Sequence, residues 1–219
     1  MKNLFKIEII VSLLAFGVLL LIVSFTNNTG EGGDSIVHYL YSHYSFEYPE
    51  FFLRHWAKPV FVLLSSPFAQ FGFKGIIVFN SICATLTGLF SYYIVRHLKV
   101  KPSWFVFLTL FFAPLYFKLI FSGLTEYLFG LFLVIGIYLV CKSQYTFASI
   151  ILSFLPLIRS EGLIILGVFG LFFLIQKKYK SLPYLLLGQA IYTVIGASYY
   201  RDVFWVFNKI PYAKMSSPY

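Results

Sequence analysis

The run IEIIVSLLAFGVLLLIVSF, residues 7–25, decides the class of fold that this chain can adopt. About 20 mostly apolar residues in a helix match the thickness of the hydrocarbon core of a bilayer. A signal peptide begins in a similar way, but the following residues 26–29, TNNT, lack a small-residue cleavage site. We therefore predict an uncleaved helix that anchors the chain in a membrane.

The same apolar character extends along the chain. Of the 219 residues, 59% are hydrophobic and 11% are charged, whereas about a quarter of a soluble domain is charged. The mean hydropathy is +0.83, so lipid must be the solvent for much of the surface. We predict an all-α, polytopic transmembrane bundle of about seven spanning helices. The predicted spans are residues 7–25, 75–95, 103–121, 124–141 and 182–200, with two shorter runs at 146–158 and 162–176.

A long first outer loop, residues 26–74, separates the first two spans. Its apolar part, 59–73, is interrupted by Ser65, Ser66 and Pro67. We therefore expect an interfacial or re-entrant segment there.

The net charge of +9 does not indicate a nucleic-acid-binding protein. The 17 Lys and Arg residues stand between apolar runs, without a basic face or arm. Such spacing is typical of topology signals. Cys83 and Cys141 each lie within an apolar segment, which favours two buried thiols with neither a disulfide nor a metal role.

The acidic residues are strongly one-sided. With the N-terminus in the cytoplasm, the short inner loops are dense in Lys and Arg, and only Glu8 among the acids is inner or embedded. The other seven of the eight acids are outer: Glu31, Asp34, Glu47, Glu50, Glu126, Glu161 and Asp202. We expect a multi-pass protein of the plasma or inner membrane with its active face outside.

The first outer loop contains the strongest candidate for a general base. Asp34, His38 and Tyr41 are spaced i, i+4 and i+7, which places them on one helical face. A carboxylate there could remove a proton from a hydroxyl or hold a divalent cation. Asp after two glycines is also a natural N-cap, and the local pattern favours capping over catalysis.

The tetrapeptide Arg159-Ser160-Glu161-Gly162 lies between two apolar runs that are short for spans. Its charges are therefore expected below the outer headgroup plane, where charges usually face a wet cavity or a partner. An internal ion pair and a phosphate held by Arg159 are both open. Glu126 at another outer turn is explained by first-turn electrostatics. No tight zinc-ligand pattern occurs among the histidines, so we predict no specific metal site.

Several short motifs, in order, resemble the GT-C superfamily of membrane glycosyltransferases, which includes the dolichyl-phosphate-mannose mannosyltransferases and the aminoarabinose transferases. The matching stretches are EGGD at 31–34, RHWAKP at 54–59, SSPFAQFG at 65–72, VFN at 78–80, GLTEYLFG at 123–130 and PLIRSEG at 156–162. The resemblance covers nearly the whole chain. Relatives are usually much longer, so we expect residues 1–219 to be one GT-C-like domain that forms the N-terminal part of such an enzyme.

The resemblance implies transfer of a sugar from a polyprenyl-phosphate donor to an acceptor hydroxyl on the outer face. Asp34 would be the base with Glu31 nearby, and Arg159 would contact the donor phosphate. The other substrate-binding candidates are His38, His55, Lys58, Glu126 and Glu161. Some relatives use a divalent cation such as Mg²⁺ or Mn²⁺, which this sequence neither requires nor excludes. The acceptor would be a lipid, a glycan or a protein.

Two other classes of function remain open. Intramembrane charges such as Arg159 and Glu161 could line a transport pathway, although the halves of the chain show no internal repeat. A non-catalytic membrane subunit is the third possibility. Clustering of the acids on one face, rather than along a path across the bilayer, favours the glycosyltransferase.

Overall fold

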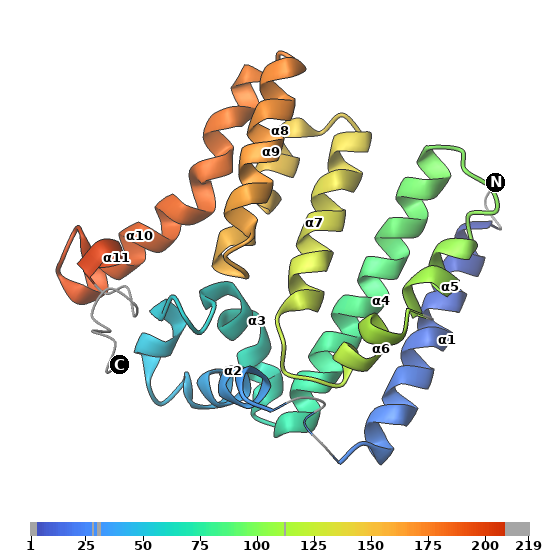
Figure 1. Cartoon of the computed structure of the whole chain (residues 1–219), viewed down its shortest axis with the longest axis horizontal. Coiled ribbons are helices and arrows are strands. Elements are labelled where there is room, and N and C mark those ends of the chain that lie inside the picture. The colour runs from blue at the N-terminus through green and yellow to red at the C-terminus, as the bar shows by residue number, and fades with distance from the viewer. Residues whose placement is uncertain (1–3, 28, 30–31, 112, 209–219) are drawn as a thin grey trace, which may run out of the picture.

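A computed structural model of the chain describes residues 4–27, 29, 32–111 and 113–208. Within these residues the regular elements are all helical and no strand occurs, which confirms the all-α prediction. The two longest helices, α1 (Leu4–Phe25) and α4 (Phe73–His97), lie side by side, and α7 (Glu126–Cys141) packs against the other side of α4 (Figure 1).

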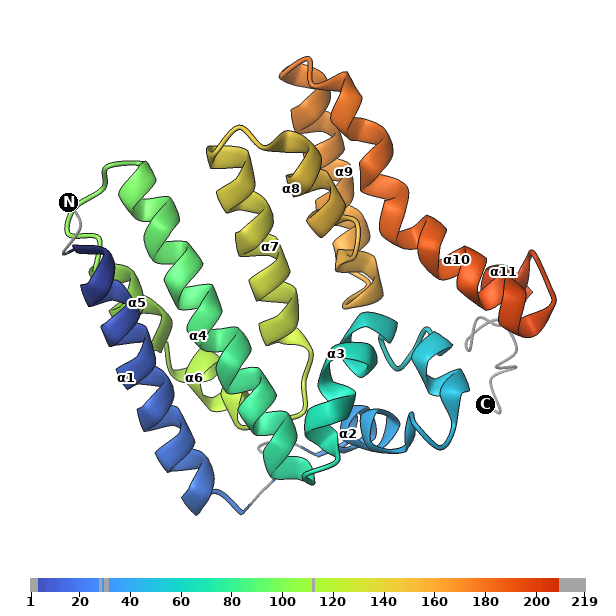
Figure 2. The same ribbon diagram turned by 180° about the vertical axis from the view of Figure 1, so that it is seen from behind.

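The second half of the chain continues from α7 as a set of shorter helices. These are α8 (Tyr145–Leu152), the 3-10 helix η2 (Leu155–Leu157), α9 (Gly162–Ile175), the 3-10 helix η3 (Tyr179–Leu186), α10 (Leu187–Tyr200) and α11 (Trp205–Asn208). Helix α10 leads away from the α8–α9 pair toward the side of the molecule opposite α1 (Figure 2).

Two helices of the described part are long and apolar enough to cross a bilayer, Ile7–Phe25 and Phe73–His97. The described residues therefore do not show the seven spanning helices that were predicted. The expected span 103–121 is divided into α5 (Phe105–Phe111) and α6 (Pro114–Ile120). Pro114 explains the division: it lacks an N–H, and the preceding Ala113 is extended (φ −74°, ψ 111°) rather than helical. The expected span 182–200 likewise begins as η3 and becomes α-helical only from Leu187.

Much apolar surface is exposed on helices α1 and α9, at the periphery of the bundle. Only 22% of the apolar window of α1 is buried against the rest of the molecule. Large apolar side chains are exposed along both α1 and α9, among them Leu13, Leu14, Leu21, Leu163, Ile164, Leu171 and Ile175. Soluble monomers rarely expose apolar patches larger than a few hundred Å², so the exposed faces of α1 and α9 are candidates for contact with lipid or with a partner.

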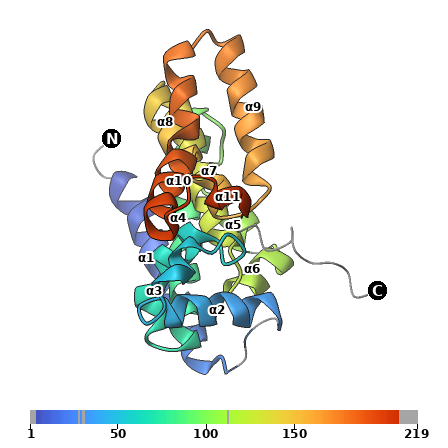
Figure 3. The ribbon, with the colours of Figure 1, turned by 90° about the vertical axis from the view of Figure 1, so that its left-hand side faces the viewer.

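The first loop covers one end of the bundle. Helix α2 (Asp34–Tyr44), the 3-10 helix η1 (Pro49–Leu53) and α3 (Pro59–Ala69) lie across this end, seen from the side in Figure 3. The C-terminal end of α1 and the N-terminal ends of α4, α7 and α9 point to the same end (Figure 1). A core that includes Phe61, Ile77, Tyr127 and Ile158 joins the loop to the helices. The predicted interfacial segment is thus an 11-residue helix, too short to span.

The opposite end of α1 is held by one ion pair. Arg96, in the last turn of α4, contacts the Glu8 carboxylate at 3.1 Å, and the Glu8 side chain is 1% exposed. Loss of Arg96 would leave the buried Glu8 carboxylate unpaired, so the pair favours the observed register of α1 along α4.

Candidate active site

Three acidic and two basic side chains line one pocket at the loop-covered end of the bundle. The pocket has a volume of about 340 Å³. Its lining residues come from α2, the turn before α3, the loop before α7 and the turn before α9: Asp34, His38, Trp56, Lys58, Leu124, Thr125, Glu126, Arg159, Ser160 and Glu161. Five of the predicted substrate-binding residues and the predicted base Asp34 therefore meet in one place.

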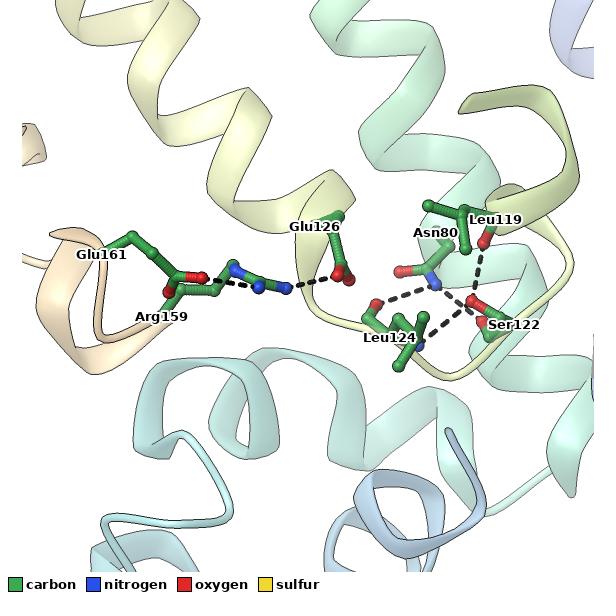
Figure 4. Close-up of polar contacts among 7 residues, drawn as sticks. All are labelled: Asn80, Leu119, Ser122, Leu124, Glu126, Arg159 and Glu161. Carbon is green, nitrogen blue, oxygen red and sulfur yellow. Dashed lines mark hydrogen bonds and ion pairs between the residues drawn. The ribbon is translucent and has the colours of Figure 1, made fainter. Parts of the chain in front are cut away.

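Arg159 joins two of the carboxylates in this pocket (Figure 4). Its guanidinium donates to Glu161 at 2.8 Å and also contacts Glu126 from the other side. The hydrogen bond from Arg159 lowers the pKa of Glu161. The internal ion pair that the sequence left open is therefore formed in the structure. A phosphate bound at Arg159 would add to its contacts with Glu126 and Glu161, or replace them.

The turn that carries Arg159 depends on a close backbone approach at Gly162. The Arg159 N–H donates to the Leu155 carbonyl at 2.9 Å, which closes the turn after η2. A Cβ at Gly162 would lie 2.4 Å from backbone atoms of Leu155 and Pro156. Only glycine allows this approach, so Gly162 sets where Arg159 and Glu161 stand.

The loop before α7 is fixed to α4 and to α2. Asn80 of α4, fully buried, donates from Nδ2 to the carbonyls of Ser122 (2.7 Å) and Leu124 (3.2 Å) (Figure 4). The Gly123 N–H donates to Ser35 Oγ at 2.6 Å. These contacts place the first turn of α2 beside Glu126, although 88 residues separate Ser35 from Gly123.

Replacing Gly123 with alanine is expected to separate α2 from this loop. A Cβ at Gly123 would lie 2.2 Å from the Ser35 carbonyl oxygen, and such overpacking costs about 1–3 kcal/mol. The expected result is a lower temperature of thermal unfolding and faster protease cleavage in the 26–58 loop. Gly130→Ala in α7 is the matched control, because no atom lies within 4 Å of its added Cβ. Equal stability of the two variants would contradict this account of α2 docking.

Asp34 is the first residue of α2, and its predicted role as N-cap is wrong. The N-cap is Gly33, with φ 59°, and no side chain makes a capping hydrogen bond there. Glycine is suited to this position because a positive φ is costly for other residues. The exposed Asp34 carboxylate thus lines the pocket without a hydrogen bond in the described residues, while the helix N-terminus favours its negative charge.

His38 lies one turn further along α2 and is buried. Its ring stacks on Trp56 (centroids 5.4 Å apart, planes at 22°) and contacts Phe61. Burial, together with the nearby Lys58 and Arg159 charges, lowers the pKa of His38 to about 4, against the opposing effects of Asp34 and a hydrogen bond to Ala57. His38 is therefore neutral at physiological pH. Tyr41, the third residue of the predicted face, instead contacts Phe51 and Trp56 and does not line the pocket.

The burial of His38 predicts a loss of stability in acid. In the unfolded chain the histidine binds a proton below about pH 6.5, whereas in the folded chain it does so only below about pH 4. The unfolded state thus binds more protons in this window, and stability falls as the pH falls through it. We expect the free energy of unfolding to drop by about 1.5 kcal/mol more between pH 6.5 and pH 5 in the wild type than in His38→Asn. Parallel pH profiles of chemical unfolding would contradict this.

Lys58 has an unusual backbone conformation and a single side-chain hydrogen bond. Its φ is 63°, in the left-handed region, at the residue that precedes α3. The Nζ atom donates to Ser160 Oγ at 3.0 Å. Burial lowers the pKa of this amine, partly against the attraction of Glu161. Within the described residues Lys58 has no carboxylate within ion-pair distance. It therefore makes fewer internal polar contacts than Arg159, the other cation of the pocket.

Two predicted site residues stand apart from this pocket. His55 lines a neighbouring pocket of about 540 Å³ formed with Glu50, Arg54 and aromatic residues of α10 and α11, and Glu31 lies outside the described residues. Trp56, Thr125 and Ser160 line the site but were not predicted. Each is directly next to a predicted residue in the sequence: Trp56 follows His55, Thr125 precedes Glu126, and Ser160 follows Arg159. This adjacency was the available signal. In the described ranges no group of three His, Cys, Asp or Glu side chains could hold a metal ion.

Comparison with known proteins adds no assignment: no family model, curated protein or solved structure matches this chain.

Proposed function

We propose that this protein is an integral membrane glycosyltransferase that moves a sugar from a polyprenyl-phosphate donor to an acceptor hydroxyl at the non-cytoplasmic face. One observation supports the proposal above the others. The Asp34 carboxylate and the cations Lys58 and Arg159, which are far apart in sequence, line one pocket. A base and cations around one cavity are what displacement of a phosphate by a hydroxyl requires.

In the proposed reaction, the acceptor oxygen attacks the anomeric carbon of the sugar while Asp34 removes the proton of the hydroxyl. The bond between the anomeric carbon and the phosphate oxygen breaks, and its electron pair leaves with the phosphate. The polyprenyl phosphate gains one negative charge as Asp34 becomes neutral, so charge is conserved. Lys58, together with Arg159, would offset the charge that develops on the phosphate.

A bilayer location is part of the proposal. The exposed apolar surfaces of α1 and α9 support it, as do the two helices of spanning length. With the N-terminus in the cytoplasm, the pocket would open at the outer face, where a lipid-linked donor and an outer acceptor can meet. The shorter helices would then cross only part of the core, or cross it where the bilayer is thinned.

Cysteine labelling tests this orientation. Glu47→Cys, on the loop-covered end, is expected to react with a membrane-impermeant maleimide in intact cells, whereas Lys180→Cys, near the opposite end, is expected to react only after permeabilisation. Both native side chains are exposed, and Cys83 is buried, so replacing Cys141 removes the main background. Labelling of Lys180→Cys alone in intact cells would reverse the proposed topology.

Sugar transfer itself is tested with the purified protein in lipid nanodiscs. Polyprenyl phosphates carrying radiolabelled hexoses or pentoses serve as donors, and a membrane lipid and glycan extract provides acceptors. Transfer of label to an acceptor, with release of polyprenyl phosphate, is expected. Absence of both for every donor would count against a glycosyltransferase and favour a subunit or transport role.

A further inference from the structure

A second pocket, of about 540 Å³, neighbours the one that contains Asp34 and shares no lining residue with it. One wall is formed by η1 and the turn after it. The other is formed by the end of α10 and the start of α11, which lie beside this part of the first loop (Figure 1). The proposed sugar transfer uses none of its lining residues, which include Glu50, Arg54, His55, Tyr199, Tyr200 and Trp205.

The two walls of this pocket are joined by contacts inside the protein. The Tyr192 hydroxyl donates to the Leu53 carbonyl, which ties α10 to η1. Trp205 packs against Gly196, where an added Cβ would lie 2.0 Å from the indole ring. The Trp205 Nε1 also donates to the Thr193 carbonyl at 2.9 Å. The pocket is therefore built into the packing of α10 and α11 on the first loop.

Glu50 and Arg54 bring opposite charges to the pocket, and neither is paired. Within the part of the chain that the structure describes, no ion pair or side-chain hydrogen bond involves either residue. The Arg54 guanidinium lies over the Tyr41 ring, 5.3 Å from its centroid. That contact uses the face of the guanidinium and leaves the N–H groups in its plane available. Both charges are accessible, since Arg54 is exposed and Glu50 only partly buried.

An apolar stripe along α10 leads into this pocket. Ile191, Ile195 and Tyr199 are spaced by four residues, which places them on one face of the helix. Their side chains are 41%, 54% and 50% exposed, and Tyr199 lies at the pocket end of the stripe. The surface therefore offers, in line, an apolar track for a hydrocarbon chain and a charged, aromatic pocket for a headgroup. This arrangement matches the two parts of a lipid.

The charges at the wall select among lipid headgroups. Burial lowers the pKa of His55, so this ring adds no charge at neutral pH, and the lining carries one carboxylate and one guanidinium. An anionic headgroup would gain from Arg54 but meet Glu50 as a like charge, and a neutral headgroup would pair with neither. A zwitterionic headgroup has a phosphate for the N–H donors of Arg54 and an ammonium for Glu50 and for the ring face of Tyr199.

We infer that this pocket and the α10 stripe bind a zwitterionic phospholipid, with its phosphate at Arg54, its ammonium at Glu50 and one acyl chain along Ile195 and Ile191. The inference rests on the bilayer location within the proposed function but not on sugar transfer, because the two pockets share no lining residue. A bound lipid would also stabilise the docking of α10 on η1, since its headgroup would contact both.

Native mass spectrometry of the purified protein, titrated in detergent micelles with lipids of identical chains, tests the inference. The lipids are phosphatidylethanolamine, phosphatidylcholine, phosphatidylglycerol and a neutral monoglucosyl diacylglycerol. We expect the wild type to bind the two zwitterionic lipids about 10-fold more tightly than the other two. Arg54→Met should weaken binding of phosphatidylethanolamine by about 10-fold. Glu50→Gln should weaken it by a similar factor without weakening phosphatidylglycerol, so that the discrimination is lost.

Arg201→Met and Glu47→Gln are the matched controls. Both native side chains are exposed and neither lines the pocket, so both variants should bind phosphatidylethanolamine like the wild type. Ile195→Ser should weaken binding by about 5-fold, because it removes apolar surface from the track of the acyl chain. Thermal unfolding checks that each variant is folded. If Arg54→Met does not fold, Arg54→Gln takes its place.

The outcomes separate this inference from the proposed function. Equal affinity for all four lipids, or a preference for phosphatidylglycerol or the glycolipid, would overturn the inference. An equal effect of Arg54→Met and Arg201→Met, or unchanged binding in Ile195→Ser, would do the same. A preference for zwitterionic lipids that depends on Arg54 and Glu50, in a protein that transfers no sugar, would uphold the inference and remove the glycosyltransferase. Sugar transfer without this preference would do the reverse.

Discussion

Replacing Asp34 with asparagine is expected to lower the initial rate of sugar transfer by about 100- to 10,000-fold, the range that a positioned general base contributes. The amide has nearly the same shape as the carboxylate but cannot take the acceptor proton. Asp34 is exposed at the first turn of α2 and makes no capping hydrogen bond, so stability should change little. The measurement is the rate of label transfer from the polyprenyl-phosphate sugar that the wild type uses.

The matched control for Asp34→Asn is Glu47→Gln. It removes one carboxylate from the same loop, but at an exposed position that does not line the pocket. Its transfer rate should stay within about twofold of the wild type, since surface substitutions away from a site have small effects. Full activity of Asp34→Asn would exclude Asp34 as the base. An equal loss in both variants would indicate a general effect of loop charge instead.

Replacing Arg159 with methionine is expected to reduce transfer by about 10- to 100-fold and to destabilise the fold. Arg159 is the only partner of the Glu126 carboxylate within the described residues and also pairs with Glu161. Removing it leaves Glu126 charged and partly buried. Because the Glu126 side chain is 33% exposed, we discount the cost of an unpaired buried charge to about 1–2 kcal/mol. Thermal unfolding and the transfer rate are measured on the same preparation.

The double variant Arg159→Met/Glu126→Gln separates the two effects. Neutralising Glu126 removes the unpaired charge, so thermal stability should return toward the wild type, in the manner of a double-mutant cycle. Transfer should stay low, because a cation beside the donor phosphate is still missing. Recovery of both stability and transfer would show that Arg159 acts only as a structural counterion, leaving Lys58 as the phosphate contact.

Several site residues were predictable from the sequence because local rules act on them. The spacing of Asp34 and His38 places both on one helical face, and both line the pocket. The short apolar runs around Arg159 and Glu161 predicted that these charges lie within a recess. The capping interpretation of Asp34 failed because Gly33, with a positive φ, begins the helix instead.

Other features depended on contacts that no local pattern encodes. Helix α2 reaches Glu126 through the bond between Ser35 and Gly123, across 88 residues. The pairing of Arg159 with Glu126 joins two helix starts that sequence spacing does not relate. His55, next to Trp56 in sequence, faces another pocket, because consecutive residues of the turn before α3 point in different directions.

The sequence by itself determined that the chain is helical and strongly apolar, because helix periodicity and hydropathy are local properties. The placement of seven acids on one side of a membrane stays a prediction. The sequence also identified all five charged residues that line the pocket. Only the tertiary structure decided where the helices break, that Arg159 is shared between two carboxylates, and that the His38 ring is buried against Trp56. Those features arise from distances between segments far apart in the chain, and burial sets the protonation state of His38 only after the segments have packed.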